Sequence, residues 1–276
     1  MTTVISSRAN PLIREITKLK SRHGRGKDER FLVEGVRLVE EALRAGLTVE
    51  TAVVSADVGP KGRLADLLNG LERAGARLIT VSASILGELA ETDSPQGLVV
   101  VVRRPAGAQA DDIARLARRP GPGGPPLVLV LDGLQDPGNL GTILRTAEAC
   151  AVSGVVAGKG TADPYQPKAL RASMGAAFRA GPAIGADPQA IAEVLRREGL
   201  TIVATVADDG EPLTRLNFSV PAAIVIGGEG AGVSGEWLDL VDRKGTISTP
   251  GPTESLNAAV AAAIFLYEAL RQRRLT

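Results

Sequence analysis

The second half of the chain alternates short apolar runs with amphipathic stretches. The runs at 126–131, 200–207 and 222–228 are apolar almost throughout, which is typical of strands buried on both faces. The stretches at 139–151 and 187–199 have the spacing of helices. Further strands are expected at 154–160, 181–186 and 245–250, and further helices at 166–178, 236–241 and 255–274. The alternation predicts an α/β domain with a mainly parallel sheet and helices on both faces.

The first half shows the same alternation on a smaller scale. A basic helix is expected from about Pro11 to Arg22, and a strand leading into a helix over 31–46. Further strands are expected at 49–56, 76–82 and 97–104, and further helices at 62–75 and 83–91. This half is therefore predicted to be a smaller α/β domain of its own.

A proline- and glycine-rich segment separates the two halves. Residues 117–126 contain four prolines and three glycines, which can continue neither a helix nor a central strand. We therefore predict a domain at 1–105, a linker at 106–125 and a second domain at 126–276.

Three strand-to-helix loops of the second domain carry polar and glycine residues that packing does not require. They lie at 131–145, 226–235 and 248–257. Ligands of open α/β sheets bind beyond the carboxyl ends of the strands, so we expect these loops to meet at one site. The candidate residues there are Asn139, Arg145, Glu229, Ser255 and Asn257. Of these, Asn139 and Ser255 also suit the N-cap of the helix that follows.

The loop at 226–235 also matches a dinucleotide-binding pattern. Gly230, Gly232 and Gly235 satisfy G-x-G-x-x-G after an apolar strand. That turn normally opens a nucleotide-binding fold, whereas only 41 residues follow Gly235. A nicotinamide or flavin oxidoreductase is therefore the disfavoured alternative.

Composition excludes several other kinds of site. Cys150 and His23 are the single cysteine and the single histidine, so no intrachain disulfide or cysteine-built zinc site can form, and we expect no metal. No apolar run reaches the ~20 residues of a membrane helix, and the first 20 residues lack the apolar core of a signal peptide. We expect a cytoplasmic protein without a membrane partner.

Positive charge is concentrated at the start of the chain. Residues 1–30 hold eight Lys and Arg against three acids, although the net charge of the whole chain is only +1. Such a cluster favours binding of phosphate groups, and hence of nucleic acid. The candidate RNA contacts are Arg8, Lys18, Lys20, Arg22 and Arg25, with residues 20–27 expected as a solvated loop.

Four segments of the second domain together resemble the SpoU/TrmH family of RNA ribose 2′-O-methyltransferases, of the SPOUT class. Three are similar to the family's motifs: DPGNLGTILRTA, VIGGEGAGVS and TESLNAAVAAAIFLYE. The fourth, YQPKALRASMGAAF, is similar to the family helix with a Ser-x-Gly-Ala signature, here Ser173, Gly175 and Ala176. The resemblance covers about 127–273. The first domain resembles the L30e-like substrate-binding domain that these enzymes often carry.

The resemblance implies a trefoil knot in the second domain, a homodimer with its active site near the interface, and S-adenosyl-methionine as cofactor. It implies a cofactor pocket formed by Gly228, Gly230, Ile247, Leu256, Ser255 and Asn257. The family often has Ile-Pro-Met before its third motif, where this chain has Ser248 and Thr249 after Ile247. Because that loop contacts the cofactor mainly through its backbone, we expect cofactor binding to be kept.

By the same resemblance, Arg145 is the principal catalytic residue, positioned by Glu229 and Asn139, and Lys168 and Arg171 contact the RNA backbone. Two roles for Arg145 stay open: it accepts the proton of the ribose 2′-hydroxyl, or it clamps a substrate phosphate. The second suits a guanidinium, which keeps its proton and binds phosphate through paired hydrogen bonds. The expected substrate is 23S ribosomal RNA. The alternatives are transfer RNA as substrate, or a non-catalytic RNA-binding or ribosome-assembly protein on the same fold.

Overall fold

The computed structural model describes residues 4–59, 61–93, 95–105, 110–121, 124–251 and 255–274. The chain divides into two compact units. One contains Met1–Pro105 together with Tyr165–Arg179, and the other contains Ala106–Pro164 together with Ala180–Thr276. We call them the N-terminal unit and the C-terminal unit.

The C-terminal unit is built on a parallel sheet, as its apolar runs predict. Within the described residues the strand order is β10-β12-β9-β11-β6-β7-β8, and every pairing is parallel. The strands are β6 (Leu127–Asp132), β7 (Gly154–Ala157), β8 (Ala183–Ile184), β9 (Thr201–Val206), β10 (Glu211–Pro212), β11 (Ala222–Gly227) and β12 (Arg243–Thr246). The central strands β6 and β11 are buried along their whole length.

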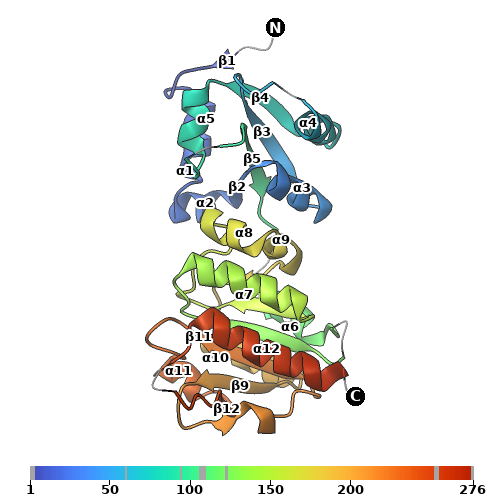
Figure 1. Ribbon diagram of the computed structural model, residues 1–276, viewed down its shortest axis with the longest axis vertical. Helices are drawn as coiled ribbons and strands as arrows, with labels where there is room; N and C mark the ends of the chain where they lie inside the picture. Colours follow the sequence, from blue (N-terminus) through green and yellow to red (C-terminus); the bar gives the residue numbers. More distant parts are fainter. Residues whose placement is uncertain are drawn as a thin grey trace. The chain divides into compact units, whose positions relative to one another are not determined.

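Helices cover both faces of this sheet, which confirms the expected α/β architecture. On one face, Val128 and Val130 of β6 pack in a core with α6 (Ala110–Arg118), α10 (Pro188–Arg197) and α11 (Gly235–Leu238). The other face is covered by α7 (Pro137–Ala149) and α12 (Ala258–Arg274), which lie side by side in Figure 1. The strand order does not establish the trefoil knot, which stays a prediction.

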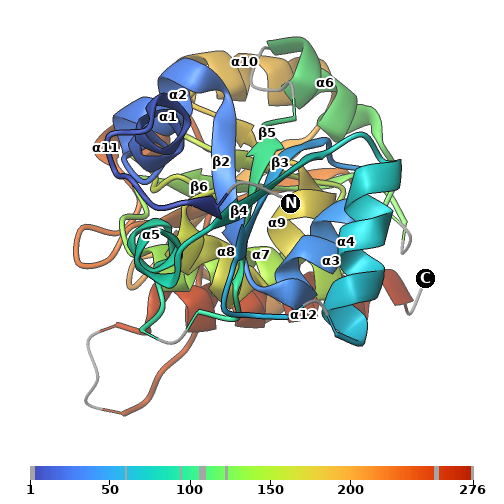
Figure 2. The ribbon, with the colours of Figure 1, turned by 90° about the horizontal axis from the view of Figure 1, so that it is seen from above.

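The N-terminal unit contains a smaller, mixed sheet. Within the described residues its order is β1-β4-β3-β5-β2, with β5 antiparallel to both of its neighbours. The strands are β1 (Val4–Ile5), β2 (Arg30–Glu34), β3 (Val49–Ser55), β4 (Arg77–Val81) and β5 (Leu98–Arg103). Figure 2 shows α1 (Pro11–Lys18) and α5 (Ala83–Leu89) on one side of these strands. On the other side lie α3 (Val36–Arg44) and α4 (Arg63–Arg73).

The basic segment near the start of the chain is more ordered than expected. The first helix ends at Lys18, and a second helix, α2 (Arg22–Asp28), occupies most of the expected loop at 20–27. Ser21 begins α2, because its Oγ accepts a hydrogen bond from the Gly24 N–H (3.0 Å).

The helix expected at 166–178 is interrupted. It is divided into α8 (Pro167–Ser173) and α9 (Ala176–Ala180) by Met174 and Gly175, which both have positive φ angles. Gly175 is required there, since a Cβ at this position would lie 2.8 Å from the Cβ of Glu41.

The linker expected at 106–125 also contains helix. Residues 110–118 form α6, whose Ile113 and Leu116 are buried against the sheet of the C-terminal unit. The dense run of prolines and glycines begins only at Pro120, after the helix has ended, so the residues before it can form a helix with an apolar face.

Candidate active site

The site lies where β6, β9, β11 and β12 end. Strands β6 and β11 are paired in register up to Asp132 and Gly227, so the loops that follow them start side by side. The loop after β12 leads to α12, which packs on α7. Parallel pairing thus brings together the three loops singled out in the sequence.

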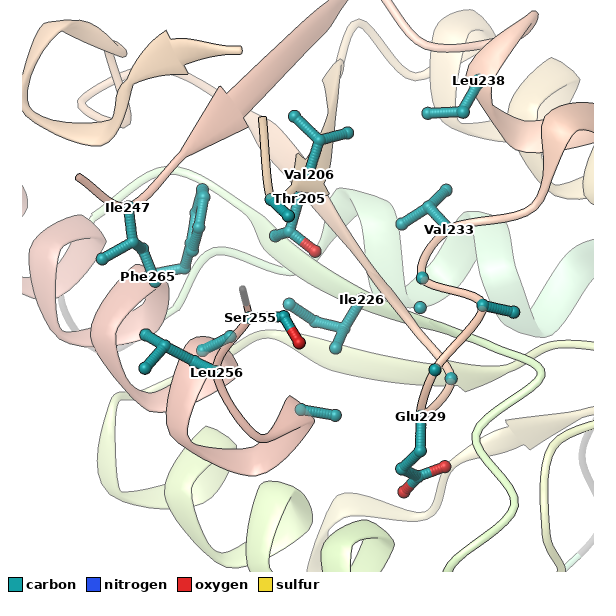
Figure 3. Close-up of a pocket in the computed structure, with 18 of the residues that line it drawn as sticks. Thr205, Val206, Ile226, Glu229, Val233, Leu238, Ile247, Ser255, Leu256 and Phe265 are labelled. Carbon is teal, nitrogen blue, oxygen red and sulfur yellow. The ribbon is translucent and has the colours of Figure 1, made fainter. Parts of the chain in front are cut away.

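A cavity of about 340 Å³ opens between these loops. Figure 3 shows Ile247, Phe265 and Leu256 on one side, Val233 and Leu238 on the other, and Ile226, Val206 and Thr205 between them. Ser255 lies at the centre of this view and Glu229 at one end. The cavity is therefore mainly apolar with a few polar groups, which is usual for a small-molecule site.

The glycine-rich loop forms one wall through its backbone. The Gly232 N–H donates to the Gly228 carbonyl (3.1 Å), and Gly230 and Gly232 have φ angles of +81° and +68°. Asp132 holds the far end of the loop, where its Oδ2 accepts from the Ser234 N–H (2.7 Å). Because only glycine adopts these angles at little cost, the loop can present peptide groups rather than side chains to a ligand.

Glu229, in the loop after β11, is bonded directly to residues that follow β6 and, through Asn139, to the loop before α12. Its Oε1 accepts from Asn139 Nδ2 (2.7 Å), and its Oε2 accepts from the Gln135 N–H (3.2 Å). Asn257 Nδ2 in turn donates to Asn139 Oδ1 (3.1 Å). The three candidate residues Glu229, Asn139 and Asn257 therefore form one hydrogen-bonded chain.

These bonds keep Glu229 ionised. Partial burial by itself would raise the pKa of Glu229, but hydrogen bonds from the Asn139 side chain and from backbone N–H groups outweigh burial. The net effect is a pKa below the usual range of a glutamate. At neutral pH Glu229 is therefore a hydrogen-bond acceptor and a fixed negative charge.

The helix caps differ from those expected. Asp136, not Asn139, caps α7 by accepting from the Asn139 N–H at Oδ1 (2.8 Å). Asn257, not Ser255, caps α12 by accepting from the Ala259 N–H at Oδ1 (2.9 Å). Since Asp136 takes over the cap, the Asn139 amide is available for Glu229 and Asn257, and Ser255 lines the cavity instead.

Arg145 is exposed on α7 and, within the described residues, forms no hydrogen bond or ion pair through its side chain. The pairing of Glu229 with Arg145 expected from the sequence is not formed in this chain. Glu229 is bonded to Asn139 instead, which lies more than one helical turn earlier.

Two of the five N-terminal residues singled out for RNA binding serve the fold. Arg25 is only 3% exposed and donates to the Leu19 and Lys20 carbonyls (3.2 and 2.7 Å). Lys20 Nζ donates to the Glu88 and Ala90 carbonyls (2.7 and 2.9 Å). Arg8 pairs with Glu88. The side chains of Lys18, Arg22, Lys168 and Arg171 are exposed and accessible to RNA.

Sequence reasoning missed Gln135, Asp132 and Asp136. Asp132 ends the apolar strand β6, and Gln135 and Asp136 follow it in the loop already expected to form the site. Polar residues directly after a buried strand are the signal that could have identified them. The contribution of Gln135 comes from its backbone, which no residue pattern reveals.

The cavity walls fit an adenosine-bearing cofactor. Five of the six residues expected to hold it line the cavity, namely Gly228, Gly230, Ile247, Ser255 and Leu256, whereas Asn257 lies in an adjoining groove. At Gly228 a Cβ would come within 2.5 Å of the Gly133 carbonyl oxygen, so a side chain there would disturb the neighbouring loop. Apolar walls suit a planar base, and exposed peptide groups suit its polar edge.

Within the described residues, no helix is long and apolar enough to cross a membrane. That part of the chain also contains no cluster of three or more metal-ligating side chains.

The fold and the cavity define an α/β protein whose small-molecule site lies at the carboxyl edge of a parallel sheet. Residues 126–267 match the model of the SpoU rRNA methylase family, and residues 10–100 match the model of the MRM3-like substrate-binding domain. The chain belongs to the SpoU rRNA methylase family.

Known relatives extend over nearly the whole chain. The 23S rRNA (guanosine(2553)-2′-O)-methyltransferase RlmP of Bacillus subtilis is 34% identical, over 95% of this chain and 97% of its own. The 23S rRNA (uridine(2479)-2′-O)-methyltransferase of Streptomyces viridochromogenes is 33% identical, over 92% and 87%. The AdoMet-bound rRNA methyltransferase of Sinorhizobium meliloti has a similar structure, with a TM-score of 0.84, 27% identity and 98% of each chain covered.

Proposed function

We propose that this protein transfers a methyl group from S-adenosyl-methionine to a ribose 2′-hydroxyl of 23S ribosomal RNA, in the cytoplasm. The observation that carries the proposal is the cavity beside the glycine-rich loop, joined through Glu229 to Asn139 and Asn257. The substrate class is supported by the relatives named for 23S rRNA, which cover most of this chain.

S-adenosyl-methionine supplies the methyl group when it is bound in the cavity. Val206, Ile247 and Phe265 would hold its adenine by apolar contact, and the backbone of the glycine-rich loop would meet its polar atoms. The rate would depend mainly on holding the ribose oxygen in line with the methyl group, since positioning can account for several kcal/mol of a barrier.

Arg145 is the proposed catalytic residue. Its guanidinium has no ion-pair partner within the described residues, so it is available to the substrate. A guanidinium gives up its proton only at very high pH, which favours a role in clamping a substrate phosphate by two hydrogen bonds. Glu229, Asn139 and Asn257 would act as positioning residues that fix the loops around it.

We further propose that the protein is a homodimer formed through α7 and α12. Val260, Ile264 and Tyr267 of α12 are 48%, 37% and 66% exposed, although they follow one another at helical spacing on one face. They border a groove that also contains Asn139 and Asn257. A second copy covering this groove would bury the apolar face and place the interface next to the active site.

Domain roles follow from the same proposal. Residues 1–105 would bind the RNA, with Lys18 and Arg22 as accessible basic contacts, and residues 126–276 would carry out methyl transfer. Lys168 and Arg171 belong to the second range, but they lie in the N-terminal unit and would add to its RNA contacts. The knot implied by the family resemblance would lie in the second of these parts.

A methyl-transfer assay tests the proposed function. The purified protein is incubated with S-adenosyl-methionine labelled in its methyl group and, in separate reactions, large-subunit RNA, small-subunit RNA and transfer RNA. We expect label in large-subunit RNA, at a nucleotide that resists alkaline hydrolysis because its 2′-oxygen is blocked. Label confined to transfer RNA would favour the alternative substrate. Absence of label together with absence of calorimetric binding of S-adenosyl-methionine would favour a non-catalytic RNA-binding protein.

A further inference from the structure

A second cavity, of about 580 Å³, lies in the N-terminal unit. It is bordered by the turn between β2 and α3, by Thr92, Asp93 and Gln96 before β5, and by helix α8. Its size is within the range of small-molecule sites. Neither the proposed catalytic residues nor the proposed cofactor contacts line it.

Helix α8 is an integral part of this unit, although it comes from the middle of the sequence. The ring of Tyr165, just before α8, packs on Phe31 of β2 with a centroid distance of 4.8 Å. Phe178 of α9 packs on the Phe31 ring as well, with a centroid distance of 6.1 Å. Arg179 Nη1 pairs with Glu41 at 2.5 Å. Residues 165–179 lie within the stretch matched by the methylase model. The cavity is thus built from both halves of the sequence.

The acidic side chains near the cavity are largely occupied. Glu34 accepts hydrogen bonds from the Glu91 N–H (2.7 Å) and from the Thr92 hydroxyl. Glu41 pairs with Arg44 and Arg179. Glu40 is bonded through both oxygens to Arg63. This bond lowers the pKa of Glu40, and the nearby charge of Arg37 lowers it further.

Two arginines of the cavity are available. The side chains of Arg37 on α3 and Arg171 on α8 are exposed, and within the described residues neither forms a hydrogen bond or an ion pair. Two guanidinium groups lining one cavity form a site suited to phosphate, which arginine binds through paired hydrogen bonds.

An exposed apolar side chain completes the cavity. Met174 is 54% exposed and has a φ angle of +51°, a backbone conformation that costs free energy in a residue other than glycine. Leu38 of α3 is half-buried on the same cavity. Met174, in the strained turn after α8, therefore presents its polarizable thioether to the cavity and is not buried in a hydrophobic core.

We propose that this cavity takes one unstacked nucleotide of the substrate RNA, with its phosphate bound by Arg37 and Arg171 and its base against Leu38 and Met174. Asp93, the remaining carboxylate, then faces the base, where it accepts a base N–H. Proteins that recognise RNA sequence commonly target such splayed nucleotides. The inference rests on the proposed RNA methyltransferase function and deepens it, because it identifies a recognition site apart from the catalytic one.

Charge-removing substitutions test the proposal. The double variant Arg37→Gln, Arg171→Gln is compared with the control Lys61→Gln, Arg77→Gln, which removes the same charge from exposed residues of the same unit that do not line the cavity. Methyl transfer to large-subunit RNA and the salt dependence of RNA binding are measured, with thermal melting to verify folding.

The cavity variant is expected to raise the KM for RNA at least about tenfold with kcat little changed, and to lower the salt slope of binding by roughly 1 to 2. The control is expected to change the KM less than about twofold. Met174→Gln, which removes the apolar contact without a charge, is also expected to raise the KM for RNA.

Equal effects of the two double variants would overturn the proposal, because they would indicate diffuse charge attraction. Binding of a free nucleoside 5′-monophosphate at this cavity, with no change in the KM for RNA in the variants, would also overturn it in favour of a small-ligand site. If the unmodified protein methylates no RNA, the proposed function itself fails, which is a separate outcome.

Discussion

Asn139 shows how a single residue connects the loops of the candidate active site. It lies in the first turn of α7, where Asp136 has already satisfied its backbone N–H. Its side-chain amide therefore donates to Glu229 and accepts from Asn257, so that one residue links the loops after β6, β11 and β12. An amide suits this role because it has both donors and acceptors. Arg145, in contrast, is held by no partner within the described residues.

Replacing Arg145 by alanine is expected to lower kcat for methyl transfer by at least about 100-fold, the usual scale for losing a donor that stabilises charge in a transition state. Binding of S-adenosyl-methionine and the melting temperature should be unchanged, because Arg145 is exposed and does not line the cofactor cavity. Calorimetry and a methyl-transfer assay measure the two effects. Arg119→Ala, another exposed arginine of the same unit, is the control. Normal turnover by the Arg145 variant would remove this residue from the mechanism.

At the scale of an element, α12 is anchored at both ends. Asn257 caps its first turn, and Arg273 anchors its last turn by donating to the carbonyls of Phe218 (2.7 Å), Val220 (3.2 Å) and Pro126 (3.3 Å). Arg273 is 8% exposed, and burial lowers its pKa to about 10, so it is still charged at neutral pH. The helix is thereby fixed against β6 and β11, whose loops form the site.

Arg273→Met is expected to lower the free energy of unfolding by about 2–4 kcal/mol, because buried carbonyl groups lose a charged donor. The control is Arg271→Met on the same helix, which breaks only the exposed pair with Glu268 and should leave stability nearly unchanged. Denaturant titration of both variants measures the difference. Similar stability of the two variants would show that the carbonyl contacts of Arg273 contribute little.

At the scale of the whole molecule, the proposed dimer accounts for an unusual helix surface. Ala262, Phe265 and Leu266 of α12 are buried within the chain, yet apolar side chains continue around the helix to Val260, Ile264 and Tyr267. A helix that is apolar nearly all round is normally buried on all sides. Because the outer side chains border a groove that contains Asn139 and Asn257, assembly and activity are expected to depend on each other.

Ile264→Glu is expected to weaken the dimer at least about 100-fold, because the interface would bury an unpaired carboxylate. Sedimentation analysis over a range of concentrations should detect monomers, and methyl transfer should fall with dimer content. Val4→Glu, at an apolar residue of the other unit that is 46% exposed, is the control. A variant that stays dimeric and active would place the interface elsewhere.

The elements of the C-terminal unit were predictable because burial on both faces leaves a clear signal. The apolar runs that became β6, β9 and β11 could not be mistaken for surface segments. The less regular parts were harder to predict. Helix α6 lies directly before a run of prolines and was therefore assigned to the linker. Strand β12 begins at Arg243, two residues before the expected strand, because its first residues are charged and do not resemble a buried strand.

The sequence predicted that these candidate residues would come together, but not how they are hydrogen-bonded. The residue types and their places after apolar strands identified Asn139, Glu229, Ser255 and Asn257. The bond from Asn139 to Glu229 could not be inferred, because it joins residues 90 positions apart and depends on the register of β6 with β11. Likewise, the sequence marked Arg25 as a cation for RNA, whereas the turn after α1 buries it among backbone carbonyls.

The sequence by itself determined the alternation of strands and helices, the family resemblance and the candidate residues, because these depend on local periodicity and on residue types in fixed order. Only the tertiary structure decided which partners those residues have: Asn139 with Glu229 rather than a cap, Asp136 and Asn257 as the caps, and α8 as part of the N-terminal unit. The physical reason is that a polar group forms its hydrogen bond with whichever partner is near in space. Which partner is near depends on how strands that are distant in the sequence pair with one another.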